Sequence, residues 1–469
     1  MRAFGILSVS TLLLAGCSLT TAGGLSECET SADCGVEQVC TQNFCLPQPA
    51  GCGTIYGDTT DPNAVQIGAV LPLSLSATDP SAGQDTSEVQ GLNAIRLALD
   101  ELNEPGRNSR KITLHMCDTA FDAMRTADQT RWLVNEKKIV ALLTAGSSQT
   151  LAAAAVTLPA GVLTMSSSAT SPELTSKEDN TKVGLLWRTA PSDAIQGRVI
   201  ANLLLNDARF NSVQKIGLLY LDKDSYGLGL FEVITERLRG SSKNVRPVPY
   251  LRKDENSMLN AVLQLDPFDP DITVVVGFED DATFLVKRGL STTNLKTGAG
   301  HRWFFSDSAK DAALLDDKEP DVRTEVQGAN GTAPAQGAGQ AFNSFQLRFI
   351  QKYGPDPRNF SFTSHAYDSM YLLGLGVAYS QASSGAVTGA KMAEGLTKVS
   401  SGSNPPIELT PTNFGKAASE LAAGRSVDVE GASGSLQFDA AGEAPSPIEL
   451  WKVEGSNFVA VENIPPPSP

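Results

Sequence analysis

The fold is decided by the stretch Gln66-Ile67-Gly68-Ala69-Val70-Leu71. It is followed by residues 87–103, which have the pattern of an amphipathic helix, and then by a second apolar run at 111–117. Within 87–103, apolar side chains recur every three or four residues, as on the buried face of an amphipathic helix; they are Val89, Leu92, Ile95, Leu99 and Leu102. The first run is almost continuously apolar, which is typical of a parallel strand covered on both faces. A strand–helix–strand unit is therefore expected here.

The same alternation repeats along the chain. We expect further strands at 139–144, 162–166, 215–221, 245–251, 272–277 and 302–306, with helices between them. Strands that alternate with helices predict a doubly wound α/β architecture with parallel sheets. So many strands exceed one sheet of ordinary size, so we expect two doubly wound lobes.

The N-terminus has the features of an export signal. Arg2 precedes an apolar run of about a dozen residues, too short to span a membrane. The run ends in Leu14-Ala15-Gly16-Cys17, which resembles a bacterial lipobox. We expect a signal peptide at 1–16, a lipid anchor on Cys17 and a linker at 17–27; an ordinary signal peptide is the alternative. The protein would then be exported and held at a membrane, on the periplasmic face of the inner or outer membrane or at the cell surface.

The other cysteines indicate disulfides. Most of them crowd near the N-terminus, and one stands alone; they are Cys28, Cys34, Cys40, Cys45, Cys52 and Cys117. In an exported chain this spacing predicts a disulfide framework. We expect a Cys-rich module at 28–63 with two bridges inside 28–45, and a third bridge from Cys52 to Cys117; four cysteines allow three pairings. Zinc is the alternative, but no Cys-x-x-Cys pair occurs, so no metal is expected.

The charge balance narrows the possible partners. The chain has 52 acidic residues against 37 Lys and Arg, a formal net charge of −15. Phosphate groups would be repelled, so we expect no nucleic-acid partner. An anionic membrane surface is also a poor partner, which leaves the lipid as the anchor.

Two hydroxyl-rich loops follow neighbouring strands, where ligands bind in open α/β sheets. In Gly146-Ser147-Ser148-Gln149, either serine could cap the following helix, whose first N–H groups would suit a carboxylate. In Ser167-Ser168-Ala169-Thr170-Ser171-Pro172, Ser171 is expected to cap a helix that begins at Pro172. Two such loops facing one crevice favour a ligand with an anionic group.

From here a family resemblance becomes visible. The segment 145–174 resembles the branched-chain amino-acid (LIV-type) substrate-binding proteins of ABC importers. Similar motifs follow in order: Arg188-Thr189-Ala190-Pro191-Ser192-Asp193, Gln196-Gly197, Asp224-Ser225-Tyr226-Gly227, Gly277-Phe278, Ser306-Asp307, Gly331-Thr332-Ala333-Pro334, His365-Ala366-Tyr367-Asp368, Gly431-Ala432-Ser433-Gly434 and Glu449-Leu450-Trp451-Lys452-Val453. The resemblance spans residues 65–463.

The resemblance implies a two-lobed periplasmic-binding clamshell of type I, closing on a small solute for a membrane permease. It implies a first lobe at 64–188 plus 308–430, a second at 189–307 plus 431–463, and a tail at 464–469. It also implies that no cofactor is needed.

The resemblance further assigns ligand contacts. Ser147 and Thr170 would bind the carboxylate of an amino-acid-like solute. The backbone carbonyl of Ser168 and the side chain of Asp307 would take its ammonium group. Tyr226 and Phe278 would close the pocket from the second lobe.

Some positions depart from the family pattern. The first strand is followed by Leu71-Pro72-Leu73-Ser74, where familiar members have a Gly-rich loop with Tyr-Gly, so one aromatic wall is absent. Phe278 and Asp307 stand where the branched-chain receptor has Tyr and Glu. A leucine pocket is therefore not expected, and polar amino acids, amides or urea-like solutes stay open.

Catalysis is not expected. Gly146-Ser147-Ser148-Gln149-Thr150 does not match a Gly-x-Ser-x-Gly elbow, and His115, His301 and His365 are the only histidines. We interpret His115 and His301 as structural, and Asp280-Asp281 and Asp222-x-Asp224 as solvated loop acids. The alternatives to a transport receptor are a ligand-binding sensor for a membrane signalling partner and a surface interaction lipoprotein that binds no solute.

Overall fold

A computed structural model describes residues 26–30, 33–35, 38–41, 43–177, 184–402 and 405–467. The chain forms two compact units, which divide after Gln48. The expected signal peptide and Cys17 lie outside the described residues, as does most of the expected linker. No helix within the described ranges combines the length and the apolar character needed to cross a membrane.

The N-terminal unit is a disulfide-bonded hairpin. Strands β1 (Gln38–Thr41) and β2 (Phe44–Pro47) pair antiparallel, and Cys28–Cys40 and Cys34–Cys45 are bonded. The third disulfide, Cys52–Cys117, lies in the C-terminal unit, as expected for this pair. The expected module at 28–63 extends too far, because residues 52–57 form a strand of the next sheet.

The first large sheet has six strands, in the order β3-β5-β4-β6-β7-β8. All neighbours are parallel except β3, which runs antiparallel to β5. The strands are β3 (Cys52–Gly57), β4 (Val65–Leu71), β5 (Ile112–Asp118), β6 (Ala141–Thr144), β7 (Leu163–Ser166) and β8 (Leu186–Arg188).

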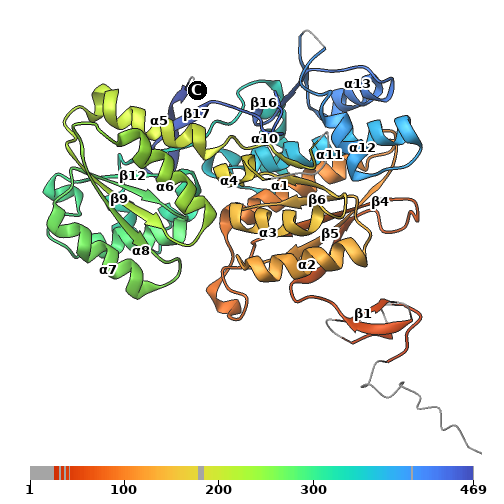
Figure 1. Ribbon diagram of the computed structural model, residues 1–469, viewed down its shortest axis with the longest axis horizontal. Helices are drawn as coiled ribbons and strands as arrows, with labels where there is room; N and C mark the ends of the chain where they lie inside the picture. Colours follow the sequence, from red (N-terminus) through yellow and green to blue (C-terminus); the bar gives the residue numbers. More distant parts are fainter. Residues whose placement is uncertain are drawn as a thin grey trace, which may run out of the picture. The chain divides into compact units, whose positions relative to one another are not determined.

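Helices cover both faces of this sheet because its strands are apolar on both sides. Ile67 and Ala69 of β4 pack in a core with α1 (Thr86–Leu102), whereas Val70 packs on the opposite face with α2 (Ala123–Asn135) and α3 (Ser147–Thr157). In Figure 1, α2 and α3 lie together on one side of the sheet, away from α11 and α12. The lobe is completed by α4 (Pro172–Thr175), α10 (Gln340–Tyr353), α11 (Thr363–Ser384), α12 (Gly389–Leu396), α13 (Pro411–Ala422), β14 (Ile407–Glu408), β15 (Val429–Gly431) and β16 (Gly434–Ser435).

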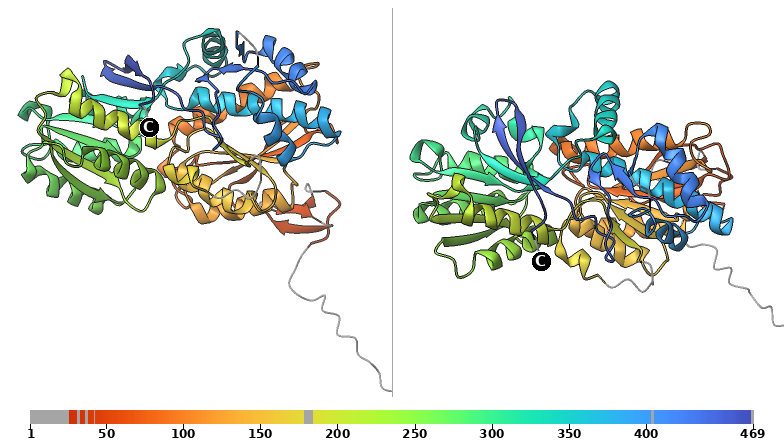
Figure 2. Two further views of the ribbon diagram at one scale, coloured as in Figure 1. Left: turned by 45° about the horizontal axis from the view of Figure 1, so that its top comes forward. Right: turned by 90° about the horizontal axis from the view of Figure 1, so that it is seen from above.

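The second large sheet has seven strands, in the order β10-β9-β11-β12-β13-β17-β18. The first five are parallel, and β17 and β18 add an antiparallel hairpin, seen in dark blue beside this sheet in Figure 2. Its strands are β9 (Lys215–Leu221), β10 (Asn244–Tyr250), β11 (Ile272–Val276), β12 (Arg302–Phe305), β13 (Asn330–Pro334), β17 (Ile448–Glu454) and β18 (Asn457–Ile464). Pro247 and Pro249 are tolerated in β10 because this strand forms an edge.

This sheet is also covered on both faces. Leu218, Val274 and Phe304 pack with α5 and α6, whereas Leu219, Val275 and Phe305 pack on the opposite face with α7 and α8. The helices are α5 (Asp193–Asn206), α6 (Ser225–Leu238), α7 (Glu255–Leu265), α8 (Glu279–Gly289) and α9 (Pro320–Glu325). Short 3-10 turns include η6 (Asp307–Ala309), η7 (Ala312–Leu315) and η8 (Pro357–Asn359). The expected pair of doubly wound α/β lobes is confirmed.

The lobe boundaries differ from those expected. Strand β13 lies in the second sheet, and η7 and α9 pack in the second lobe's core, so the chain returns to the first lobe after Pro334 instead of at 308. Ala432 and Leu436 belong to the first lobe's core, so the final crossing falls after them and not at 431. Near residues 308 and 431, the motifs shared with the family predict strands and turns. Such motifs do not show which of the two sheets a strand joins.

Candidate ligand-binding site

The loops that carry the expected ligand residues are neighbours because of strand register. Thr144 at the end of β6 pairs with Ser166 at the end of β7, and Ser166 pairs with Arg188 at the end of β8. The parallel carboxyl ends therefore meet at one edge of the first sheet. This brings the loop before α3 against the loop before α4.

Helix α3 begins at Ser147 and is preceded by Gly146, whose φ of 75° is a backbone conformation that favours glycine. Gly146 occupies the capping position, and no side chain caps the helix. The expectation that Ser147 or Ser148 would cap α3 is therefore wrong. The turn at Gly146 places both serines inside the first helical turn, where their hydroxyls are available for other contacts. Ser171 does cap α4, since its Oγ accepts from the Glu173 N–H at 3.2 Å.

Ser147 links the two loops. Its Oγ accepts from the backbone N–H of Thr170 at 3.2 Å and of Ser171 at 3.1 Å, and the residue is 3% exposed. Both bonds use the oxygen as acceptor, so the hydroxyl proton can be donated to a third group. Beside it, the Gly146 N–H donates to Ser168 Oγ at 2.9 Å. The region can therefore supply donors to an anionic group.

A buried carboxylate lies behind this region, on the second lobe. Asp307 Oδ1 accepts from the Tyr226 hydroxyl at 2.7 Å and from Gln196 Nε2 at 3.0 Å. Asp307 is fully buried, and its other oxygen has no hydrogen-bond partner among the described residues. The network thus holds one oxygen and leaves the second to accept from a ligand.

Burial raises the pKa values of two carboxyl groups at this site, those of Asp307 and Asp193. Desolvation raises the pKa of Asp307 to about 6, and the hydrogen bond from Tyr226 partly opposes the rise. Asp193, also fully buried, has a pKa well above its usual range, first because of burial and then because of the charge of Asp307. Two neighbouring buried acids of this kind are stabilised by a cation.

A cavity of about 30 Å³ lies between the lobes. Four of the six expected ligand residues line it, namely Ser147, Ser168, Tyr226 and Phe278. Thr170 and Asp307 are buried close to it through their bonds to Ser147 and Tyr226. Phe362, at the start of α11, adds an aromatic surface that the loop after the first strand does not supply.

Three carboxylates that the sequence analysis did not single out also line this cavity. Asp85 and Glu88 come from the start of α1, and Glu279 is the first residue of α8. Asp85 is 2% exposed and Glu279 is 4% exposed. Glu279 comes directly after a strand and so could have been found by position, whereas Asp85 and Glu88 stand beyond a longer loop.

A fourth acid joins them. One carboxylate oxygen from each of Asp85, Glu279 and Asp311 lies within 4.8 Å of those of the other two. Asp311 Oδ1 accepts from Thr86 Oγ1 at 2.9 Å, which joins the second lobe to the first. Burial and neighbouring charges raise the pKa of Asp85 to about 7.

Arg252 lies at the edge of this group. Its guanidinium carbon is 3.8 Å from the ring centre of Phe121 in the first lobe and 3.7 Å from that of Phe278 in the second. It also forms an ion pair with Asp280 at 3.3 Å. A guanidinium held between two rings is attracted to both ring faces, so Arg252 draws the lobes together.

Two of the acids interpreted as solvated, Asp281 and Asp224, are held in contacts instead. Asp281 is 1% exposed, and Asp224 caps α6 while its Oδ2 accepts from Ser148 Oγ across the lobes at 2.7 Å. The Ser225 N–H also donates to Ser148 Oγ at 3.2 Å. Charge alone predicted exposure, but Asp224 is turned toward the first lobe, and Asp281 accepts from the Tyr250 hydroxyl inside the second lobe. By contrast, His115 and His301 are buried in single hydrogen bonds to Gln66 and Thr273, which fits structural roles.

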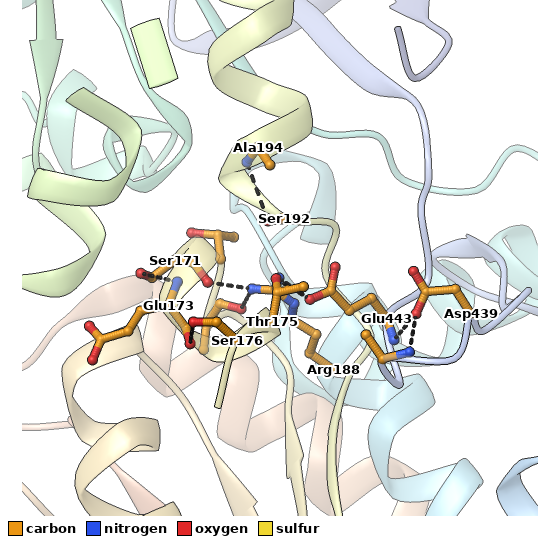
Figure 3. A network of polar contacts seen from close by, with 12 residues as sticks. Ser171, Glu173, Thr175, Ser176, Arg188, Ser192, Ala194, Asp439 and Glu443 are labelled. Carbon is orange, nitrogen blue, oxygen red and sulfur yellow. Dashed lines mark hydrogen bonds and ion pairs between the residues drawn. The ribbon is translucent and has the colours of Figure 1, made fainter. Parts of the chain in front are cut away.

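An ion pair supports the loop before α4 from behind (Figure 3). Arg188 Nη1 donates to the carbonyls of Ala169 at 3.1 Å and Ser171 at 2.9 Å, while its Nη2 pairs with Glu443. Both side chains are at least nine-tenths buried. Arg188 therefore positions the segment that carries Thr170.

Comparison with known proteins identifies the family. A family model described as the receptor family ligand binding region matches residues 90–456. The chain belongs to this receptor family.

Among curated receptors, the chain is similar to the chemotactic signal transduction system substrate-binding protein BasB of Halobacterium salinarum. The two are 25% identical over 382 residues, covering 80% of this chain and 84% of BasB.

Solved structures show the same fold. The leucine binding protein LivK of Thermotoga maritima has a TM-score of 0.67 at 17% identity, covering 86% of this chain and 99% of LivK. LivJ of Streptococcus pneumoniae, in complex with isoleucine, has a TM-score of 0.64 at 19% identity, covering 85% and 99%. A Rhodopseudomonas palustris solute binding protein in complex with benzoate has a TM-score of 0.64 at 15% identity, covering 86% and 97%. The resemblance stated from the sequence is thus confirmed for family and fold.

Proposed function

We propose that this receptor-family protein is an extracytoplasmic solute receptor that captures a small amino-acid-like solute between its lobes for an ABC importer. The observation that carries the proposal is the cavity lined from both lobes by Ser147, Ser168, Tyr226 and Phe278, with the buried carboxylate of Asp307 behind it. A zwitterion needs donors at one end and acceptors at the other, and both are present.

The solute would be oriented by opposite charges. Its carboxylate would accept from Ser147 and from Thr170, next to the first turn of α3. Its ammonium group would lie by Asp307 and the Ser168 carbonyl. Tyr226 holds Asp307 in place and, with Phe278, would cover the solute. A cavity of about 30 Å³ holds about one water molecule, so an amino acid enters only when the lobes separate.

A sensor is the second candidate, since BasB is named as a component of chemotactic signal transduction. Both functions would use the same site and the same closure. Genes for an ABC permease and ATPase next to this gene would favour transport, and a gene for a membrane signalling protein there would favour sensing.

The location of the protein, outside the cytoplasm and at a membrane, is also part of the proposal. Three disulfides fit an oxidising compartment outside the cytoplasm. A lipid on Cys17 would tether the receptor to a membrane. Replacing Cys17 by Ala is expected to release exported protein into the soluble fraction; retention in the membrane fraction would exclude the lipid anchor.

A thermal-shift screen of the protein against amino acids, amides and small aromatic acids tests solute binding. At 100 times Kd, a true ligand adds about 2.7 kcal/mol to the free energy of unfolding. No shift with any compound would count against the receptor function and in favour of a surface interaction protein.

The role of Asp307 is tested with the ligand found. Asp307→Asn is expected to weaken binding of a zwitterion by about 2–5 kcal/mol, since the ammonium group loses its buried charge partner. Asp317→Asn is the control, because the Asp317 side chain is 88% exposed. Calorimetric titration that gives the same affinity for both variants would contradict this assignment.

A further inference from the structure

The acids around the cavity exceed what a neutral amino acid requires. Asp307 alone would accept an ammonium group, yet Asp85, Glu88 and Glu279 also line the cavity, and Asp311 reaches the same cluster. Clusters of acids are common on protein surfaces, where water and salt screen their charges, so a cluster indicates a ligand only where it is buried. This one is buried between the lobes.

Glu279 shows that the cluster is only partly compensated within the protein: the charge of Arg252 acts on it, but no direct partner within the described ranges does. It is 4% exposed and lines the cavity, and neither a hydrogen bond nor an ion pair reaches its carboxylate from the described residues. Asp311 Oδ2 is likewise buried without a hydrogen-bond partner among them. A buried carboxylate without a partner is costly, and a cation placed beside it removes much of that cost.

Arg252 offsets part of this charge, because it attracts Asp85 and Glu279, but it forms its ion pair with another acid. Arg252 pairs with Asp280 and is held between Phe121 and Phe278. Its attraction is therefore shared with an acid outside the cavity lining.

The spacing of the cluster suits an ammonium group. Its oxygens, from Asp85, Glu279 and Asp311, all lie within 4.8 Å of one another. Three acceptors around one nitrogen at about 2.8 Å, a normal charge-assisted hydrogen-bond length, lie roughly 4.6 Å apart. An ammonium group supplies three N–H donors, one for each.

We propose that the cleft selects a solute with a second cationic nitrogen, a basic amino acid, whose side-chain ammonium lies among Asp85, Glu279 and Asp311. This rests on the proposed receptor function and narrows its solute class. The α-ammonium group would lie by Asp307 and the second one by the cluster, so the solute would span the cavity from one acidic site to the other.

Electrostatics supports the same solute. Burial, followed by the charge of Asp311, raises the pKa of Asp85 to about 7, and burial followed by the charge of Asp85 raises the pKa of Glu279 well above its usual range. These carboxyls repel each other when ionised. A side-chain ammonium stabilises the ionised forms, whereas a neutral side chain leaves the repulsion in place.

Lysine and norleucine make a matched pair of probes, since they share a chain length and differ in the terminal ammonium. We expect calorimetry on the whole protein to show lysine binding at least tenfold more tightly than norleucine. Glu279→Gln should reduce this preference to threefold or less, because lysine loses a charge partner that norleucine does not use. Glu255→Gln is the control, because Glu255 is also the first residue of a helix but its side chain is 73% exposed.

Other outcomes separate the inference from the receptor function. Norleucine binding as tightly as lysine, or binding only of another compound in the solute screen, would overturn the inference and leave the receptor function standing. A thermal shift with calcium chloride alone that is lost in Glu279→Gln would make the cluster a metal site and overturn the inference. Failure of every compound would overturn both proposals.

Discussion

At the scale of single residues, the cleft depends on how buried polar atoms are paired. Tyr226 donates its hydroxyl to Asp307 and contacts Ser306 Oγ at 2.8 Å. A hydrogen bond to a buried charged group contributes more than one between neutral groups. The tyrosine therefore stabilises the carboxylate that the proposed solute would bind.

Tyr226→Phe removes this bond without changing the ring. The free energy of unfolding should fall by about 1–3 kcal/mol, because Asp307 loses a buried donor. Chemical denaturation measures the change. Tyr220→Phe is the matched control, since the Tyr220 ring stacks on Phe231 and no hydrogen bond from the described residues reaches its hydroxyl. A fall of the same size in both variants would show that the Asp307 bond contributes nothing.

A second buried acid, Asp368, gives the protein a pH dependence that does not involve the cleft. Its carboxylate accepts from the N–H groups of Ala432 at 2.8 Å and Ser433 at 2.7 Å, and from the Ser433 hydroxyl. Burial raises its pKa from 3.8 to about 6, although the bonds from Ser433 oppose the rise. The folded state therefore binds this proton more tightly than the unfolded chain does.

The protonated Asp368 carboxyl contributes its full share to the free energy of unfolding below about pH 4. This contribution is lost as the pH rises through 6, the pKa of Asp368 in the folded state. Between pH 4 and pH 7.5, the free energy of unfolding of the wild type should fall relative to Asp368→Asn by about 2–3 kcal/mol. Urea unfolding of both proteins at several pH values checks this. A difference between them that does not change with pH would contradict the assigned pKa.

At this scale, four of the residues expected to bind the solute share one feature: each lies in the segment that follows a strand. Ser147 and Ser168 are neighbours because β6 pairs with β7, and Tyr226 and Phe278 because β9 pairs with β11; the approach of the two lobes brings all four to one cavity. Asp85 was not predicted, and Glu279 was overlooked despite its position after a strand, because burial of an acid depends on what the opposite lobe brings against it. That information lies in the packing of two segments far apart in the chain.

At the scale of elements, the crossings between lobes carry buried charge. Arg188 ends β8 at the first crossing, and Glu443 lies shortly before the last. Their ion pair fixes the loop before α4 to the C-terminal segment (Figure 3). Losing one partner would leave a buried charge unpaired.

Glu443→Gln should therefore lower the free energy of unfolding by about 3–5 kcal/mol. The measurement is denaturant unfolding, followed by titration of the variant with the receptor's ligand. Glu462→Gln is the control, because Glu462 also pairs with an arginine, Arg209, but its side chain is 53% exposed. An exposed pair contributes about 0–1 kcal/mol, so equal effects would contradict a special role for Arg188 and Glu443.

Elements with a strong apolar pattern were predicted within a few residues. Residues 215–221 coincide with β9, and 66–71 differ from β4 by one residue. Strands β3 and β8 were missed, since the first is largely exposed and the second has three residues. Both owe their structure to a neighbouring strand, and local sequence carries little sign of such pairing.

At the scale of the whole molecule, covalent bonds act separately in the two units. Cys52–Cys117 closes a long loop of the first sheet, with a sequence separation of 65, whereas Cys28–Cys40 lies inside the N-terminal unit. Closing a loop of that length restricts the unfolded chain and stabilises the folded one by about 4 kcal/mol.

The double variant Cys52→Ala/Cys117→Ala should lower the melting temperature of the C-terminal unit, which differential scanning calorimetry can follow. Cys28→Ala/Cys40→Ala serves as the control and should leave that transition in place. If both double variants shifted it equally, the two units would not be energetically independent.

The bonds from Ser148 to Asp224 and Ser225 join the lobes through protein atoms alone. They lower the free energy of closure whether or not a cargo is present. Under the proposed transport function, a receptor that closes without solute can dock on its permease and compete there with loaded copies. Stronger bonds here would then slow uptake at high receptor density, and weaker ones would require more binding energy from each solute. The contacts of Ser148 with Asp224 and Ser225 thus influence what fraction of the docked receptors carries a solute.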